Sequence, residues 1–173
     1  MKGVTSYKGI TKFYFIHLLK KIIKIGRLDK ENKKILDFGC GNNELKKMLG
    51  ERVTGYDIIP ELSDIDHWEN FDFDVLVSNQ VFYCFTKNQL SEFLKKLKDR
   101  NKKIYLIVGI SRQGIVNNIG KIIFGAADAH SETKIMPSKE IKILLDHCSL
   151  IKKDSVLFLA DIYYLELNTV TNN

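Results

Sequence analysis

The sequence has few cysteines and no long apolar segment, and both shortages exclude classes of protein. The three cysteines, Cys40, Cys84 and Cys148, are odd in number and form no Cys-x-x-Cys pair. This argues against a disulfide framework and against a metal site of the zinc type. No apolar run approaches the roughly 18 residues of a membrane-spanning helix, and the N-terminus lacks the apolar core of a signal peptide. We therefore expect a cytoplasmic protein.

Acidic residues are outnumbered by basic ones, with 21 Asp and Glu against 27 Lys and Arg and a net charge of +6. A basic balance can indicate binding to nucleic acid or to an anionic membrane surface. Here most lysines fall on the outer faces of expected helices, such as Lys95, Lys96 and Lys98. We therefore interpret the charge as a solvated surface, with RNA binding as the alternative.

The apolar spacing at the N-terminus predicts an amphipathic helix over residues 10–25. His17, Lys20, Lys21 and Lys24 share one stripe of this helix, and apolar side chains fill the opposite face. We expect the apolar face to pack on a sheet. A lid over the substrate and a surface that contacts membrane are the alternatives.

Strands and further helices alternate along the rest of the chain. This alternation predicts an α/β fold with a doubly wound, mostly parallel sheet that has helices on both faces. The last two strands are joined by a turn, so we expect them to be antiparallel. The expected strands are residues 35–38, 53–57, 73–78, 104–110, 151–159 and 162–167, with a stub at 64–66. The expected helices are residues 44–49, a helix opened by a Thr86 capping box, a short one near 115–123, and one capped by Ser138.

The turn between residues 34 and 44 is the most informative part of the sequence. Its letters, KILDFGCGNNE, describe a strand that ends in an acid, a turn through two glycines and the start of a helix. Free backbone N–H groups and the helix dipole meet at such a helix start. Glycines there let a ligand approach the backbone. In parallel sheets ligands bind at the carboxyl ends of the strands, so this turn is a candidate ligand site.

The charges around this turn distinguish between two kinds of cofactor. A dinucleotide requires Gly-x-Gly-x-x-Gly/Ala, whereas Glu44 stands at the third small position and would place bulk and negative charge at the pyrophosphate. S-adenosylmethionine has no phosphate and carries a cationic sulfonium. Asp37 can attract that cation, and Asp57, 20 residues further on, can accept both ribose hydroxyls through its two oxygens. The pattern favours S-adenosylmethionine.

Three segments also resemble the class I S-adenosylmethionine-dependent methyltransferases, especially the type 11 small-molecule branch. Residues 35–41 resemble motif I of that family, residues 53–58 its second strand with the ribose-binding acid, and residues 71–82 its fourth strand. The resemblance implies a Rossmann-like sheet of seven strands with an antiparallel last strand. It also implies cofactor contacts for Asp37, Gly39, Gly41, Asp57, Ile58, Asp66 and Asn79.

The sequence departs from the family pattern in two places. Asn43 stands where the family often has a third glycine, although Asn tolerates left-handed backbone better than most residues. The segment between Asp57 and Asp74 is short. It therefore does not determine whether the chain has the family's third strand or the residues that would line the adenine. A cofactor-binding module without catalysis is therefore an alternative to an enzyme.

The methyl acceptor is the least determined part of the prediction. Methyl transfer needs proximity, alignment and a dry site, with a general base only where the acceptor loses a proton. The catalytic candidates are His130, on the long connection after residues 104–110, and Tyr83, after residues 73–78. His67, Arg112 and Gln113 are further candidates for contacts with adenine or an anionic acceptor.

Taken together, these patterns predict one methyltransferase domain over residues 1–173 that methylates a small molecule. An apolar or lipid-like acceptor is an alternative, because residues 10–25 and 115–124 would frame an apolar mouth. An RNA methyltransferase is a second alternative, motivated by the net charge of +6. The parts of the domain are an N-terminal amphipathic helix (1–32), a cofactor-binding core (33–110), a substrate-side insertion (111–137) and a C-terminal helix with two strands (138–173).

Overall fold

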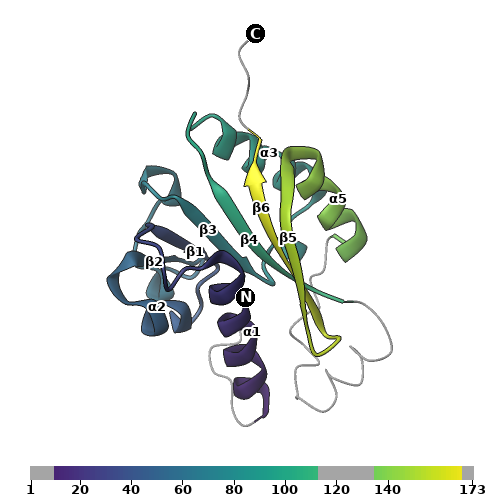
Figure 1. The fold of residues 1–173 in the computed structure, drawn as a ribbon. Coiled ribbons are helices and arrows are strands. Elements are labelled where there is room, and N and C mark those ends of the chain that lie inside the picture. The colour runs from purple at the N-terminus through teal and green to yellow at the C-terminus, as the bar shows by residue number, and fades with distance from the viewer. Residues whose placement is uncertain (1–9, 113–134, 169–173) are drawn as a thin grey trace.

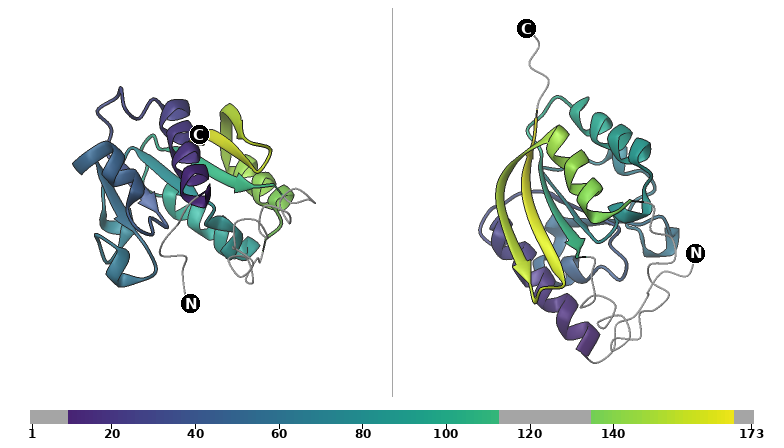
Figure 2. Two further views of the ribbon diagram at one scale, coloured as in Figure 1. Left: turned by 90° about the horizontal axis from the view of Figure 1, so that it is seen from below. Right: turned by 90° about the vertical axis from the view of Figure 1, so that its right-hand side faces the viewer.

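The computed structural model describes residues 10–112 and 135–168. Its centre is one six-stranded sheet with the strand order β2-β1-β3-β4-β6-β5 (Figure 1). Helices cover both faces of this sheet, as the sequence predicts (Figure 2). The strands are β1 (Ile35–Phe38), β2 (Val53–Tyr56), β3 (Val75–Asn79), β4 (Tyr105–Ser111), β5 (Cys148–Val156) and β6 (Ala160–Leu167). The α-helices are α1 (Ile10–Gly26), α2 (Glu44–Leu49), α3 (Lys87–Lys98) and α5 (Pro137–His147).

The strand directions agree with the expected doubly wound arrangement. Strands β2, β1, β3 and β4 are parallel, whereas β6 is antiparallel to both β4 and β5. The carboxyl ends of β1 to β4 therefore lie at one edge of the sheet, which we call the carboxyl edge. Because β5 has the same direction as β4, the turn from β5 to β6 also reaches this edge.

The predicted strand stub at residues 64–66 is wrong, and the described residues form six strands instead of seven. This stretch lies between two short 3-10 helices, Pro60–Leu62 and Trp68–Asn70. Asp64 takes the place of a pairing strand, because its backbone N–H donates to the Gly55 carbonyl at 2.9 Å and its carboxylate accepts from the Gly55 N–H at 2.7 Å. One residue thus satisfies both backbone groups of Gly55, so these groups need no further strand.

Two details of the predicted C-terminal elements are also wrong. Ser138 does not cap α5, since the helix begins at Pro137 after the N-cap residue Met136. Proline is favoured at the first helical position because it lacks an N–H group that would be unpaired there. Strand β5 begins directly after α5, at Cys148, three residues before the expected start. The capping box at Thr86 is confirmed, with Gln89 as its partner.

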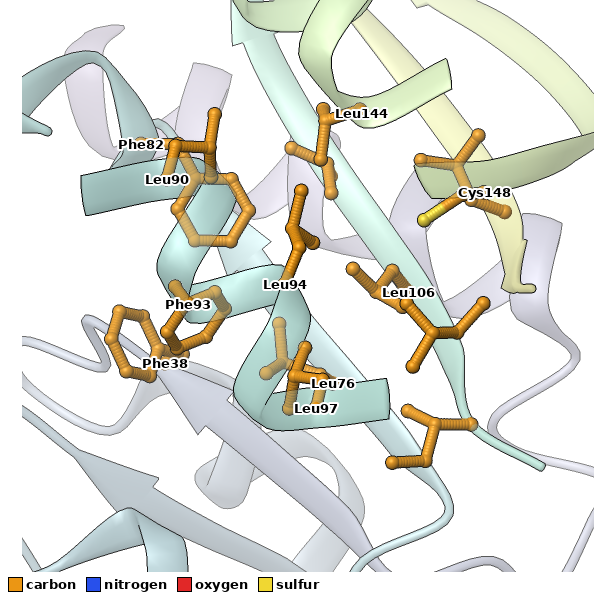
Figure 3. Close-up of a cluster of buried hydrophobic side chains, with 14 of the residues drawn as sticks. Phe38, Leu76, Phe82, Leu90, Phe93, Leu94, Leu97, Leu106, Leu144 and Cys148 are labelled. Atoms are coloured by element: carbon orange, nitrogen blue, oxygen red, sulfur yellow. The ribbon is translucent and has the colours of Figure 1, made fainter. Parts of the chain in front are cut away.

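The sheet buries two apolar clusters, one on each face. Side chains alternate between the faces of a strand, so Leu36, Phe38 and Leu76 share one cluster with residues of α3 and α5. Figure 3 shows Phe38 beside Phe93 of α3 and Leu76 beside Leu97 of the same helix. Trp68 belongs to this cluster, with its ring centroid 4.8 Å from that of Phe93. The Trp68 ring therefore fills part of the core, whereas the adjacent His67 is exposed.

Helix α1 packs on the opposite face, which confirms the main expectation for the N-terminal segment. Tyr14, Leu18, Ile22 and Ile25 are buried against Ile35, Val77 and Ile107 of the sheet, while Lys20 and Lys24 are exposed. No helix in the described part of the chain is long and apolar enough to cross a membrane.

Candidate functional site

The turn between β1 and α2 contacts β2 and the turn after β3, and it leaves open space at Gly41. The backbone N–H groups of Gly39 and Cys40 both donate to the Tyr56 carbonyl, at 2.7 and 3.1 Å. Gly39 has φ +80°, and a Cβ there would lie 2.3 Å from a methyl group of Val81, in the turn after β3. At Gly41, by contrast, no atom beyond its two chain neighbours lies within 4 Å of the position that a Cβ would take. The turn thus presents bare backbone at Gly41.

Asp57 is held beside this open backbone. Its Oδ2 accepts from the Gly41 N–H at 3.0 Å, and its Oδ1 accepts from the Ile59 N–H at 3.0 Å. A carboxylate can accept about four hydrogen bonds. Each oxygen of the half-buried Asp57 can therefore accept a hydrogen bond from one further donor. The two backbone bonds fix the orientation of the carboxylate.

Asp37 is the second acid of the site, and it is buried at 6% exposure. In the sheet it lies between Gly55 of β2 and Val77 of β3. Burial, and then the negative charges of Asp57 and Asp64, raise the pKa of Asp37 from 3.8 to about 7. Ionisation of this carboxyl is unfavourable without a nearby cation, so the site favours a positively charged ligand group.

Asn43, which stands where the methyltransferase pattern often has a third glycine, fits into the turn. Its backbone is left-handed, with φ +57°, and its Nδ2 donates to the Leu62 carbonyl at 3.2 Å. Gly55 provides the necessary room, because a Cβ on Gly55 would lie 2.1 Å from Asn43 Oδ1 and 2.7 Å from Cys40 Sγ. Burial raises the pKa of the Cys40 thiol to about 12, which fits a packing role for this residue.

Asn79 lies at the end of β3, opposite Gly109 of β4. Its side-chain oxygen is buried and has no partner among the described residues. A Cβ on Gly109 would lie only 2.5 Å from that oxygen. The absence of a side chain at Gly109 therefore leaves room for the Asn79 side chain. The next residue, Gln80, has φ +57° and donates from Nε2 to the Tyr14 hydroxyl at 3.4 Å. The first half of α1 therefore reaches the same edge.

The prediction from sequence missed the roles of Gly55 and Gly109. Glycine weakens the interior of a strand, and where it occurs it often marks a close approach of other groups. The glycines inside the apolar runs VTGY and YLIVGIS could therefore have been recognised. Asp64 gave no such signal, because its role depends on the path of an irregular segment.

The remaining predicted site residues are less closely associated with the turn. Ile58 is exposed directly after Asp57, and Asp66 is exposed on the irregular segment before Trp68. Tyr83 is half-buried in a 3-10 helix, Phe82–Cys84, after β3, where its carbonyl accepts from the Ile135 N–H at 3.3 Å. His130, Gln113 and the helix expected near residues 115–123 lie outside the described residues.

Arg112 was expected to be a contact for an anionic acceptor, but its guanidinium is already engaged. Its Nη2 donates to Asp161 Oδ1 and to Ser155 Oγ, the latter at 2.8 Å. Asp161 also pairs with Lys153 at 3.3 Å. This group of residues ties the end of β4 to the β5–β6 pair.

Comparisons with known proteins give likeness in structure alone. No family model and no curated protein matches the chain. Magnesium protoporphyrin IX methyltransferase from Synechocystis, crystallised with S-adenosylhomocysteine, is 15% identical with a TM-score of 0.60, over 96% of this chain and 90% of that one. The N-methyltransferase NodS from Bradyrhizobium japonicum, with the same ligand, is 14% identical with a TM-score of 0.58, over 86% of both chains. A methyltransferase from Aquifex aeolicus is 18% identical with a TM-score of 0.58, over 87% and 89%. The chain thus has the Rossmann-like fold of these methyltransferases.

The raised pKa of Asp37 predicts a pH dependence of stability. Asp37 keeps its proton in the folded chain up to about pH 7 but loses it near pH 4 when unfolded, so its contribution to stability is lost as the pH rises to 7. Asp37→Asn does not titrate. The stability of Asp37→Asn relative to wild type should therefore increase between pH 5 and pH 8, by up to about 3 kcal/mol.

Urea unfolding at the two pH values measures this difference, and Asp146→Asn, at an exposed acid of α5, is the matched control. An advantage of Asp37→Asn that is the same at pH 5 and pH 8 would show that the carboxyl is not perturbed.

The contact between Gly109 and Asn79 predicts a coupling between two substitutions. Gly109→Ala should destabilise the fold by roughly 1–3 kcal/mol, because the new methyl group overlaps the Asn79 amide. Combining it with Asn79→Ala removes the overlap and should restore part of that loss. Urea unfolding of the two single variants and the double variant measures the coupling. Additive effects would contradict the proposed contact.

Proposed function

We propose that this chain is an S-adenosylmethionine-dependent methyltransferase that acts on a small-molecule acceptor. The observation that carries the proposal is the pair of acids at the glycine turn: Asp57, bound to the open backbone at Gly41, and the buried Asp37. The structural neighbours crystallised with the demethylated cofactor support the choice of ligand. The resemblance of three sequence segments to the type 11 branch supports a small acceptor.

The residues present fit this cofactor. The free acceptor capacity of Asp57 suits a pair of ribose hydroxyls, and the space at Gly41 admits a ligand to the backbone. The buried side-chain oxygen of Asn79 has no partner among the described residues, so a ligand donor that reached it would satisfy an unpaired acceptor. We assign the methionine portion to Asp37, Gly39, Gly41 and Asn79. The ribose is assigned to Asp57, and the adenine to the exposed Ile58, with Asp66 at its amino group.

The bound cofactor would supply an electrophilic methyl group on a cationic sulfonium. Asp37 would be ionised by that positive charge and would then hold the methionine end in place. The bonds from Gly39 and Cys40 to Tyr56 of β2, and from Gly41 to Asp57, hold the turn in place, so little conformational entropy is lost on binding. The chain therefore contributes alignment and a fixed electrostatic environment, which are the main requirements of methyl transfer.

The acceptor side is assigned to the residues beyond the ends of β3 and β4. Tyr83 follows β3 and would contact the acceptor. His130, in the substrate-side insertion at residues 111–137, would act as the general base where the acceptor must lose a proton. The rival is a cofactor-binding module without catalysis, motivated by the short segment between Asp57 and Asp74. Turnover with any acceptor would exclude that rival.

Binding of the cofactor depends on Asp57 in this proposal. Isothermal titration should detect binding of S-adenosylmethionine to the wild-type chain, and Asp57→Ala should weaken it roughly 10- to 100-fold by removing charged hydrogen bonds to the ribose. Asp57→Asn, which retains one oxygen, should lose less.

The exposed acid Asp146 offers a control, because Asp146→Ala makes the same change of charge far from the turn. Absence of binding to the wild-type chain would refute the proposed function. Equal affinity of wild type and Asp57→Ala would refute the role of Asp57.

A further inference from the structure

The turn that joins β5 to β6 has an unfavourable sequence for its backbone. Leu157 and Phe158 both have left-handed φ angles, +46° and +58°, and the Leu159 N–H closes the turn on the Val156 carbonyl at 2.9 Å. Hairpin turns with two such residues favour Asn-Gly, and left-handed backbone costs a residue with a side chain roughly 1–2 kcal/mol. Strain of this kind is often retained at functional sites.

The two side chains of this turn also lie outside the two buried clusters of the described residues. Leu157 is 58% exposed and Phe158 is 79% exposed. Burial in the core therefore does not compensate for the backbone strain. An apolar pair that is both strained and exposed is best explained by contact with something outside the chain.

The start of α1 adds a third exposed apolar side chain to this region. Phe13 is 70% exposed, and its neighbour Tyr14 shares the buried cluster of Val156, the last residue of β5. An ion pair of 3.1 Å between Lys21 and Asp154 also holds α1 against β5. The first turns of α1 and the β5–β6 turn project from the same end of the molecule, at the carboxyl edge (Figures 1 and 2). We call Phe13, Leu157 and Phe158 the apolar tip.

Basic residues dominate α1 and β5, two of the three elements that meet at the apolar tip, whereas β6 contains two acids and no lysine. Together α1 and β5 contain six lysines and one acid, Asp154. Lys20, Lys24 and Lys152 are exposed. Lys20 lies about 10 Å from Phe13 along the helix axis, close to the Debye length of about 8 Å at physiological salt. The ammonium group of a lysine can also extend toward a charged surface while its methylene groups stay in contact with apolar side chains.

We propose that the apolar tip docks this chain on an anionic lipid bilayer. Phe13, Leu157 and Phe158 enter the interfacial region, and the exposed lysines Lys20, Lys24 and Lys152 interact with the anionic head groups. A bilayer accepts projecting apolar side chains without a matching pocket, whereas a protein partner would need one. The proposal does not rest on methyl transfer. If both hold, the site at the carboxyl edge faces the membrane and can receive a lipid-soluble acceptor from it.

Sedimentation with vesicles tests the docking. The full chain should bind vesicles of phosphatidylcholine with about one third phosphatidylglycerol, bind pure phosphatidylcholine vesicles less, and lose affinity as salt rises. The double variant Leu157→Asn/Phe158→Gly installs the favoured turn sequence, so it should fold at least as stably as wild type. Its vesicle affinity should nevertheless decrease roughly tenfold or more, because two large apolar side chains are removed.

Ile151→Thr is the matched control, because Ile151 is an exposed apolar residue in the middle of β5, and this variant should bind like wild type. Failure of the wild-type chain to bind anionic vesicles, or equal binding by the double variant, would overturn the proposal. Sedimentation velocity provides a second readout. A dimer that the double variant abolishes, without vesicle binding, would assign the apolar tip to a second copy of this chain. No cofactor is present in these assays, so their failure leaves the proposed function untouched.

Discussion

The hydrogen bond from the Gly41 N–H to the Asp57 carboxylate connects the main parts of the candidate site. It joins the turn after β1 to the residue that follows β2, and it sets the orientation of both. The shared acceptor at Tyr56 holds the beginning of the same turn. Gly55 supports this arrangement in two ways. Its lack of a side chain leaves space for Asn43, and its backbone N–H and carbonyl are both hydrogen-bonded to Asp64. The site is therefore rigid before any ligand arrives.

The sequence alone predicts most of the parallel core. The strand–turn–helix of motif I, the capping box at Thr86 and the antiparallel last strand depend on local patterns: apolar runs, turn residues and helix caps. The two acids are predictable for a related reason, because strand ends in a parallel sheet lie at one edge whatever the loops do. The structure brings Asp37 and Asp57 together there, near enough for the charge of Asp57 to raise the pKa of Asp37.

Features that depend on tertiary contacts could not be predicted in this way. The described residues have no strand at 64–66, and no periodicity indicates the two bonds between Asp64 and Gly55 that are found there instead. The burial of Trp68 against Phe93 depends on the path of an irregular segment. The partner of Arg112 is Asp161, on a strand almost fifty residues later in the chain. In each case the decisive contact joins residues without a shared local pattern.

A structure of the chain with S-adenosylhomocysteine bound would show whether the two acids hold this ligand. We expect the ribose hydroxyls to bind the Asp57 carboxylate, the ligand to pass over the open backbone at Gly41, and Asp37 to lie at the methionine end. A ligand bound elsewhere on the molecule, or one that leaves Asp57 bonded only to Gly41 and Ile59, would contradict this expectation.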